Sequence, residues 1–179
     1  MKFLLDGEQS ERLYFRLVQQ SDYNTWLPFF QDPNNFKHWI EPNESAEQAC
    51  TKWFERQLHR YEFDRGEMNA LVEKQSGELI GYCGLLVQTV DELEELEIGY
   101  SLLPQYWNKG FASEAAIKCL DYAFDRQFSP SLISIISVTN VPSARVAVKN
   151  GMTLSKTTIY KENRVNIFPN YPPGVDSAR

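Results

Sequence analysis

The chain has 179 residues, of which 42% are hydrophobic and 13% aromatic. This length and composition predict one folded domain with a substantial core and exclude a disordered chain. The formal net charge of −6 argues against direct binding to nucleic acid, because proteins that bind nucleic acid usually present basic surfaces. An acidic surface suits a cationic acceptor, although net charge influences encounter and solubility more than specific binding.

The cysteines and the apolar runs indicate the compartment. Cys50, Cys83 and Cys119 are far apart, and the chain has only two histidines, so no pair has the spacing of metal ligands. We therefore expect no metal site and three buried free thiols in a reducing cytoplasm. The first seven residues are too poor in apolar side chains for a signal peptide, and no run approaches membrane-spanning length. We expect a cytoplasmic protein without a membrane segment.

The first part of the chain predicts a strand followed by two helices. Residues 12–18 alternate between two faces, as a strand does. A helix is expected to begin at residue 21 and to be broken at 32–34, where Asp, Pro and Asn follow one another. A second helix is expected to begin at Ser45, where Gln48 three residues later completes a capping box.

The remaining chain predicts an alternation of strands and helices. The expected strands are 69–73, 79–87, 93–103, 132–138, 152–160 and 164–168. Two helices are expected, one that begins after residue 110 and one that spans 141–150. The strand at 132–138 is apolar almost throughout, as in a central strand covered on both faces. The helix after residue 110 is expected to bury a stripe that contains Ala116, Ile117, Leu120, Ala123 and Phe124.

The order of the expected elements, β-α-α-β-β-β-α-β-α-β-β, predicts the fold class. A mixed sheet covered by helices, in the α/β (α+β) class, is the natural product of this order. No internal repeat or linker divides residues 1–179, so we expect one domain with its core over about 11–168 and a coil tail over 169–179. Ligands of such sheets bind where strand ends separate and helix N-termini point into the gap.

The stretch from Gln105 to Ala116 is the strongest indication of a ligand. It follows an apolar strand and opens a helix, where several backbone N–H groups have no partner and the dipole favours an anion. Gly110 and Ala112 leave room for an anion to approach the backbone, and Lys109 adds a positive charge. The stretch lacks the patterns of a Walker loop and of a dinucleotide fingerprint, so it predicts another phosphate-bearing ligand.

Two segments, 97–115 and 140–152, resemble the GNAT acetyltransferase superfamily, and most of all its ribosomal-protein N-terminal (RimJ/RimL-type) branch. The start of the chain, 11–17, also resembles that branch, so the resemblance covers about residues 11–168. It implies the acyl-CoA N-acyltransferase fold, with a mixed and largely antiparallel central sheet flanked by helices. It also implies acetyl-CoA as the cofactor and an amine as the acceptor.

Three positions depart from the family pattern. Trp107 holds a place that is Gln or Arg in much of the superfamily, and Asn108 stands where the branch usually has an additional Gly. Asn tolerates unusual backbone angles better than most residues, which would preserve the turn. Many members have a tyrosine as general acid at the position that is Ala147 here. The identity of the acid is therefore open.

The resemblance assigns the contacts to the cofactor. The backbone N–H groups of Asn108, Lys109, Gly110, Phe111, Ala112 and Ser113 would cradle the pyrophosphate. Backbone groups of Tyr100, Ser101, Leu102 and Leu103 would pair with the pantetheine amides along a strand edge. An N–H near Tyr100 or Ser101 would donate to the developing oxyanion, an interaction worth about 3 kcal/mol. Further contacts are expected from Asn140, Ser143, Arg145 and Lys149.

For proton transfer, the sequence offers several candidates. Glu97 occupies the place of the base in several members of the superfamily and would take the amine proton; the alternative is an ordinary solvated or ion-paired glutamate. Glu95 is the fallback on the same strand face, and His38 beside Trp39 is another possible proton acceptor. Ser143 is the candidate partner of the departing thiolate, or else an ordinary first-turn helix residue. Tyr160 could replace the absent tyrosine, although no spacing requires it.

The aromatic residues before the second strand have two interpretations. They either shape the acceptor pocket, as this region does in the superfamily, or belong to the core; they are Trp26, Phe36, Trp39, Trp53 and Phe54. We expect an N-acetyltransferase, monomeric or homodimeric, that transfers acetyl directly to a protein N-terminus or a small amine, since no Ser or Cys has the context of a nucleophile. The alternatives are a non-catalytic acyl-CoA sensor or interaction module of the same fold, and an enzyme that transfers another acyl group.

Overall fold

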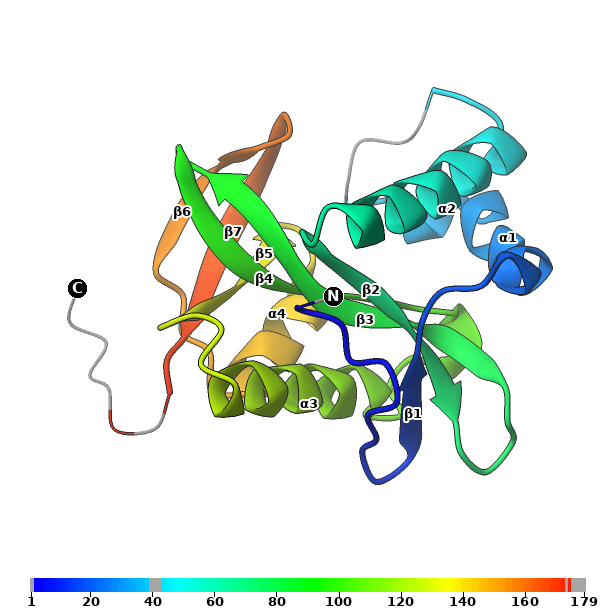
Figure 1. Ribbon diagram of the computed structural model, residues 1–179. Helices are drawn as coiled ribbons and strands as arrows, with labels where there is room; N and C mark the ends of the chain where they lie inside the picture. Colours follow the sequence, from blue (N-terminus) through cyan, green and yellow to red (C-terminus); the bar gives the residue numbers. More distant parts are fainter. Residues whose placement is uncertain (1, 39–42, 173, 175–179) are drawn as a thin grey trace.

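The computed structural model describes residues 2–38, 43–172 and 174. Its helices and strands follow one another in the predicted order (Figure 1). They are β1 (Leu13–Arg16), α1 (Tyr23–Gln31), α2 (Ala46–Glu62), β2 (Gly66–Glu73), β3 (Leu79–Val90), β4 (Leu93–Leu102), α3 (Phe111–Asp125), β5 (Leu132–Ser137), α4 (Val141–Lys149), β6 (Lys156–Tyr160) and β7 (Asn163–Asn170). Short 3-10 turns lie at Gln20–Asp22, Pro33–Asn35 and Pro104–Tyr106 (η1, η2 and η3).

The strands form one sheet in the order β1-β2-β3-β4-β5-β7-β6. Every neighbouring pair is antiparallel except β4 and β5, which are parallel. This arrangement confirms the predicted mixed, largely antiparallel sheet. The β4–β5 register pairs only Glu97 with Ile133. The two central strands therefore separate beyond that point, and the sheet opens at the C-terminal half of β4.

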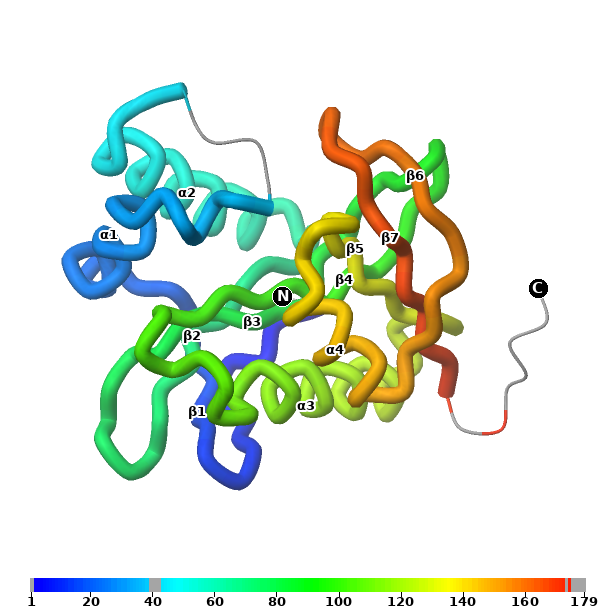
Figure 2. The backbone as a smooth tube through the Cα atoms, turned by 180° about the vertical axis from the view of Figure 1, so that it is seen from behind, coloured from blue at the N-terminus to red at the C-terminus, as the bar shows by residue number. Residues whose placement is uncertain are grey.

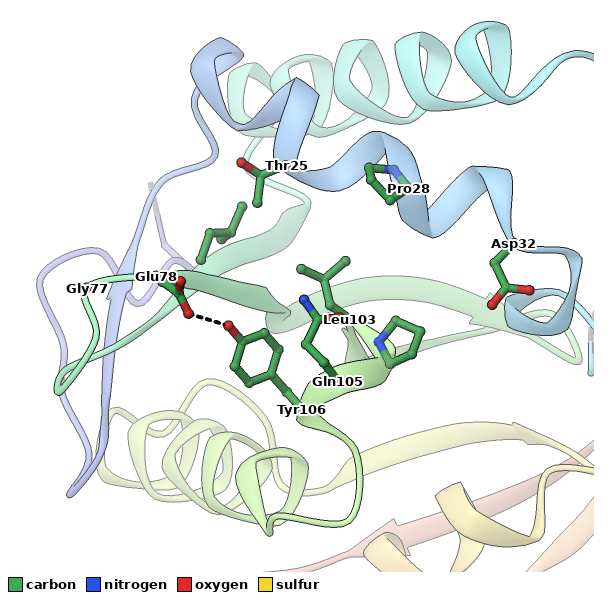
Figure 3. Close-up of a pocket in the computed structure, with 10 residues that line it drawn as sticks. Thr25, Pro28, Asp32, Gly77, Glu78, Leu103, Gln105 and Tyr106 are labelled. Carbon is green, nitrogen blue, oxygen red and sulfur yellow. Dashed lines mark hydrogen bonds between the residues drawn. The ribbon is translucent and has the colours of Figure 1, made fainter.

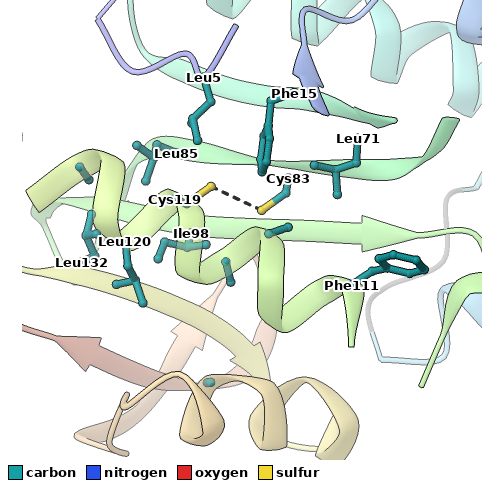
Figure 4. Packing of buried hydrophobic residues seen from close by; sticks show 14 of the residues in the cluster. Leu5, Phe15, Leu71, Cys83, Leu85, Ile98, Phe111, Cys119, Leu120 and Leu132 are labelled. Atoms are coloured by element: carbon teal, nitrogen blue, oxygen red, sulfur yellow. Dashed lines mark hydrogen bonds between the residues drawn. The ribbon is translucent and has the colours of Figure 1, made fainter. Parts of the chain in front are cut away.

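Helices cover both faces of the sheet. Helices α3 and α4 lie on one face and α1 and α2 on the other, an arrangement visible from both sides in Figures 1 and 2. The core beneath α3 includes Phe15, Ile98 and Leu120, all buried (Figure 4). Cys83 and Cys119 lie in the same core with their sulfurs 3.6 Å apart. All three cysteines are free and buried, as predicted.

The core beneath α1 and α2 is aromatic. Trp26 and Phe54 are 1% and 2% exposed, and Trp26 packs edge-on against Tyr82 of β3. Trp53 also packs against Tyr82, while Phe36 packs against the rings of α1. Trp26, Trp53 and Phe54 are therefore core residues or pack against core residues, because large rings contribute most when they are removed from water. Phe36 packs against the partly buried rings of Phe29 and Phe30 and lies outside this core. Trp39 lies outside the described residues.

Several boundaries and one helix face differ from the predictions. The first strand ends at Arg16 instead of residue 18. The Arg16 guanidinium forms an ion pair with Asp22 at 2.7 Å at this end of the strand. Ile117, expected on the buried stripe of α3, is 42% exposed, because the face centred on Ala115 and Cys119 is buried instead. Strand β6 begins at residue 156 instead of 152, since Met152 leaves the sheet to enter the core.

Candidate active site

The open edge of β4 is narrower than the sequence predicted. The N–H of Leu103 donates to the carbonyl oxygen of Ile80 on β3 at 3.0 Å. In an antiparallel pair such groups alternate sides, so Ser101 also turns its backbone groups toward β3, whereas Tyr100 and Leu102 face the gap beside β5. The expectation of a four-residue edge is corrected accordingly. Of the two candidates for an oxyanion donor, only the Tyr100 N–H points into the gap.

Trp107 closes one end of this edge. Its indole nitrogen donates to the carbonyl oxygen of Leu102 at 2.8 Å. This contact occupies the Leu102 carbonyl and ties the end of β4 to the turn that precedes α3. The groups left open on the edge are the N–H and C=O of Tyr100 and the N–H of Leu102, which are complementary to the amides of an extended ligand.

The turn before α3 has the backbone shape of an anion cradle. Asn108 and Gly110 have φ of +58° and +83°, and Gly110 is the N-cap of α3 without any side-chain cap. The first backbone bond of the helix runs from the N–H of Glu114 to the carbonyl of Gly110. The N–H groups of Phe111, Ala112 and Ser113 precede that bond and have no partner within the helix, so they are free to donate to a phosphate.

An ion-pair network holds this turn in place. The guanidinium of Arg12 contacts Glu114 at 2.7 Å and donates to the carbonyl of Lys109 at 3.0 Å. The Arg12 backbone N–H and the Ser10 hydroxyl also donate to Glu114, at 2.7 and 2.6 Å. Burial raises the pKa of Glu114, but the hydrogen bonds from Ser10 and Arg12 outweigh it, so the pKa lies below the ordinary value. Glu114 therefore holds the turn in place, and the N–H groups of Phe111, Ala112 and Ser113 remain available to a ligand.

The cationic side chains predicted to meet phosphates lie near the surface. The Lys109 ammonium sits 5.4 Å from the centre of the Tyr106 ring. Arg145 and Lys149 are exposed on α4, and neither has an ion-pair partner among the residues that the structure describes. The amide of Asn150, at the end of α4, donates to the carbonyl of Ser113 in the first turn of α3. The end of α4 is thereby held beside the cradle.

Tyr100 and Ser143, two predicted site residues, meet across the gap. The Tyr100 hydroxyl lies 2.8 Å from the Ser143 hydroxyl and 3.2 Å from the Ser143 carbonyl oxygen. Burial raises the pKa of Tyr100 to about 12, so the phenol keeps its proton near neutrality. Asn140 is the N-cap of α4, where its side-chain oxygen accepts from the Ser143 N–H at 3.1 Å. Ala147, the position of the absent tyrosine, is buried in the core beneath α3.

Glu97 lies on the opposite face of β4. Its neighbour Ile98 points into the core beneath α3, so alternation turns Glu97 toward the α1–α2 face. Gln88 donates to the Glu97 carboxylate at 2.7 Å. Burial raises the pKa of Glu97, while Gln88, nearby cations and the Ile135 N–H partly oppose this shift. A carboxylate with a raised pKa is a stronger proton acceptor than an ordinary glutamate, which suits a general base.

The other candidates for proton transfer lie elsewhere. Burial raises the pKa of Glu95, which lies two residues before Glu97 on the same face of β4, nearer the β3–β4 turn. A ring nitrogen of His38 contacts the Thr139 hydroxyl at 2.9 Å, at the turn between β5 and α4. The Tyr160 hydroxyl donates to Gln88 at 2.9 Å and so belongs to the surroundings of Glu97. Sequence patterns did not indicate Gln88, because it lies nine residues from Glu97 on another strand.

A cavity of about 580 Å³ opens beside η3, which leads into the turn before α3 (Figure 3). Residues from α1, from the β2–β3 turn and from η3 line it, among them Thr25, Glu78 and Gln105. The Tyr106 hydroxyl donates to Glu78 at 2.6 Å across one side. The cavity touches Leu103, about 20 Å along the strand from Glu97. It is therefore separate from the carboxylate that the sequence singles out.

Comparison with known proteins identifies the family. The Acetyltransferase (GNAT) domain matches residues 12–153. The chain is 28% identical over 155 residues to the uncharacterized protein YkkB of Bacillus subtilis strain 168, covering 86% of this chain and 81% of that one. It is 29% identical over 160 residues to the uncharacterized N-acetyltransferase p20 of Bacillus licheniformis, with 86% and 84% covered. The chain belongs to the GNAT acetyltransferase family, as the resemblance predicted.

Solved structures share the fold. An acetyltransferase from Agrobacterium tumefaciens strain C58 superposes with a TM-score of 0.77 at 22% identity, covering 96% of this chain and 95% of the other. RimL, a ribosomal alpha-N-protein acetyltransferase solved in complex with coenzyme A, superposes with a TM-score of 0.74 at 15% identity, with 92% and 97% covered. These structures include the branch that the sequence resembles.

None of the helices in residues 2–38 and 43–172 is long and apolar enough to cross a membrane. The same part of the chain holds no group of three His, Cys, Asp or Glu side chains arranged to bind a metal ion.

Proposed function

We propose that this GNAT protein is an acetyl-CoA-dependent N-acetyltransferase that acts directly on a primary amine, either a protein N-terminus or a small molecule. The observation that carries the proposal is the alignment of three open features: the uncapped start of α3, the free edge at Tyr100 and Leu102, and the gap where β4 leaves β5. A molecule with a diphosphate at one end and amides behind it matches all three.

The donor set fits coenzyme A. The N–H groups of Phe111 to Ser113 would hold the pyrophosphate, and Lys109, Arg145 and Lys149 would add charge around it. The backbone of Tyr100 and the N–H of Leu102 would pair with the pantetheine amides. When bound, acetyl-CoA supplies an acetyl group that is already activated as a thioester.

The residues that flank the gap divide the proton transfers. Glu97, on the α1–α2 face, would take the proton of the attacking amine, and the Tyr100 N–H would donate to the developing oxyanion. Ser143, on the α3–α4 face, would give its proton to the departing thiolate while its oxygen accepts a hydrogen bond from the Tyr100 hydroxyl. Solvent would then take the proton from Glu97 and return one to Ser143. Base and acid thus approach the thioester from opposite faces of one strand, which suits direct transfer.

Release of free thiol from acetyl-CoA, measured with a panel of amines and N-terminal peptides, tests this function. We expect thiol release that depends on the acceptor in the wild type and that is largely lost in Glu97→Gln. Binding of acetyl-CoA without acceptor-dependent release from any amine would instead favour the sensor interpretation, which the absent tyrosine at Ala147 motivates. Faster release from another acyl-CoA would identify a different acyl group.

A further inference from the structure

Gln88 joins Glu97 to Tyr160 across three strands. On β3, Gln88 pairs with Glu95, two residues along the register from the pair of Leu86 and Glu97. Its amide nitrogen lies 2.7 Å from a carboxylate oxygen of Glu97, and its amide oxygen lies 2.9 Å from the hydroxyl of Tyr160, at the end of β6. Neither Gln88 nor Tyr160 has a part in the proton transfers described above.

The carboxylate fixes the direction of both hydrogen bonds. An ionised Glu97 can only accept, so the NH₂ group of Gln88 must face it. The amide oxygen of Gln88 is then turned toward Tyr160 and can only accept, so the phenol must donate. The proton of Tyr160 is thereby committed to Gln88 and is not available to a departing thiolate. Tyr160 consequently serves the base, instead of replacing the tyrosine that is absent at position 147.

We propose that Gln88 and Tyr160 are positioning residues that hold the Glu97 side chain in one orientation and in its proton-accepting form. The proposal rests on the proposed role of Glu97 as base. Gln88 acts on Glu97 directly, and Tyr160 acts through Gln88 by keeping the amide from turning round.

The same chain of hydrogen bonds responds when Glu97 takes a proton. The N–H bond of the amine breaks, an O–H bond forms on Glu97, and no other group gains or loses a proton. Protonated Glu97 can then donate, so the Gln88 amide is free to turn its oxygen toward Glu97 and its NH₂ group toward the oxygen of Tyr160. Because this arrangement requires the phenol to give up its own donation to Gln88, the network favours the ionised state at rest.

Charged groups on every side of Glu97 bear on its titration. Lys161, in the β6–β7 turn, and Arg60 of α2 favour the carboxylate, as does the Ile135 N–H, whereas burial disfavours it. Glu67 of β2 is a like charge whose own pKa burial raises to about 7, with Arg60 opposing the shift. Arg56 of α2 is a further cation near Lys161 and Tyr160. Variants of Gln88 and Tyr160 leave all these charges unchanged.

The test is a titration of side-chain carboxyl carbons by ¹³C NMR on the whole protein without acceptor. The Glu97 signal is assigned by its loss in Glu97→Gln, and the titration is repeated in Gln88→Met and Tyr160→Phe. Thr157→Val is the matched control, because the Thr157 hydroxyl donates a hydrogen bond to the Asn166 side chain at 2.7 Å within the same β6–β7 hairpin. Thermal melts and acetyl-CoA binding show that each variant is folded.

We expect Gln88→Met to move the Glu97 titration to higher pH by about one unit, the size expected when a charge-assisted hydrogen bond is lost. We expect Tyr160→Phe to move it in the same direction by less, and Thr157→Val not to move it. A Glu97 titration that is unchanged in Gln88→Met would overturn the proposal. Because the NMR titration requires no catalysis, its result is independent of the thiol-release assay with the amine panel, which tests the proposed function separately.

Discussion

The hydroxyl of Tyr100 lies 2.8 Å from the hydroxyl of Ser143, which brings a residue of β4 to the first turn of α4. The contact spans the face of the sheet where α3 and α4 pack, whereas Glu97 projects from the other face of the same strand. A buried phenol whose pKa is raised to about 12 remains a donor throughout the neutral range. Ser143 therefore has a hydrogen-bond donor beside it where a general acid is needed.

This pairing predicts a graded loss of turnover. Ser143→Ala should lower kcat about 100-fold, since general acid catalysis contributes on that scale. Tyr100→Phe should lower it about 10-fold, which corresponds to one hydrogen bond of about 1.4 kcal/mol. The KM for acetyl-CoA should change little in either variant. Tyr122→Phe is the control, because the Tyr122 phenol also donates to a backbone carbonyl, that of Leu4, at 2.7 Å. Equal rates in Tyr100→Phe and wild type would remove the phenol from the mechanism.

The raised pKa of Glu97 predicts an acidic limb in the pH profile of kcat/KM. A base works only when it is deprotonated, so activity should fall as the pH drops through the Glu97 pKa, at a higher pH than an ordinary glutamate would require. Steady-state rates against pH should show this limb in the wild type and in Glu94→Gln, an exposed neighbour on the same strand. Glu97→Gln should lose most of its turnover and retain acetyl-CoA affinity. A Glu97→Gln enzyme with full activity and an unchanged limb would exclude this base.

The network around Glu114 predicts a stability difference that depends on pH. The pKa of Glu114 is lowered in the folded protein, so its contribution is present above the unfolded pKa of about 4.3 and is lost as the pH falls through the folded value. Glu114→Gln should lower the free energy of unfolding by about 1–2 kcal/mol at pH 7, because charge-assisted bonds from Ser10 and Arg12 are weakened. Denaturant curves at pH 7 and pH 3 check this. A difference that grows in acid would contradict the assignment.

Restoring the absent tyrosine should not restore a family acid. Ala147 is 2% exposed and belongs to the core beneath α3, so a phenol ring there has no space. Ala147→Tyr should destabilise the protein by about 1–3 kcal/mol through overpacking and should lower kcat. Calorimetric melting compared with Val148→Tyr, at an exposed neighbouring position, measures the cost of the ring itself. A stable and more active Ala147→Tyr would show that the site can accept the tyrosine.

Local patterns predicted most of the fold, whereas contacts between distant residues decided the details of the site. The order of elements followed from periodicity and turn residues, and the capping box at Ser45 and Gln48 formed as expected. Asn108 adopts the left-handed conformation for which its tolerance was noted. The position of Ile117 on α3 was wrong, because which of two apolar stripes is buried depends on the sheet beneath it.

The hydrogen bonds of the site depend on register, which the sequence does not reveal. The β3–β4 pairing directs the Leu103 N–H toward the carbonyl of Ile80. The same pairing limits the open edge of β4 to Tyr100 and Leu102. The bond between Tyr160 and Gln88 joins residues 72 positions apart. The only signal for it in the sequence was a tyrosine at the end of a strand, with no indication of its partner.

The central claim is that the open start of α3 binds the diphosphate of coenzyme A, and calorimetric titration of acetyl-CoA into matched glycine variants tests it most directly. Gly110 and Gly7 both have φ of +83°, so a glutamate at either place carries a similar backbone strain. Gly110→Glu alone puts a negative charge beside the cradle, and its Cβ also meets the Arg12 guanidinium at 3.3 Å, whereas Gly7 has open space around it. We expect wild type and Gly7→Glu to bind acetyl-CoA equally and Gly110→Glu to show no binding. Unchanged affinity in Gly110→Glu, or no heat of binding in the wild type, would contradict the account.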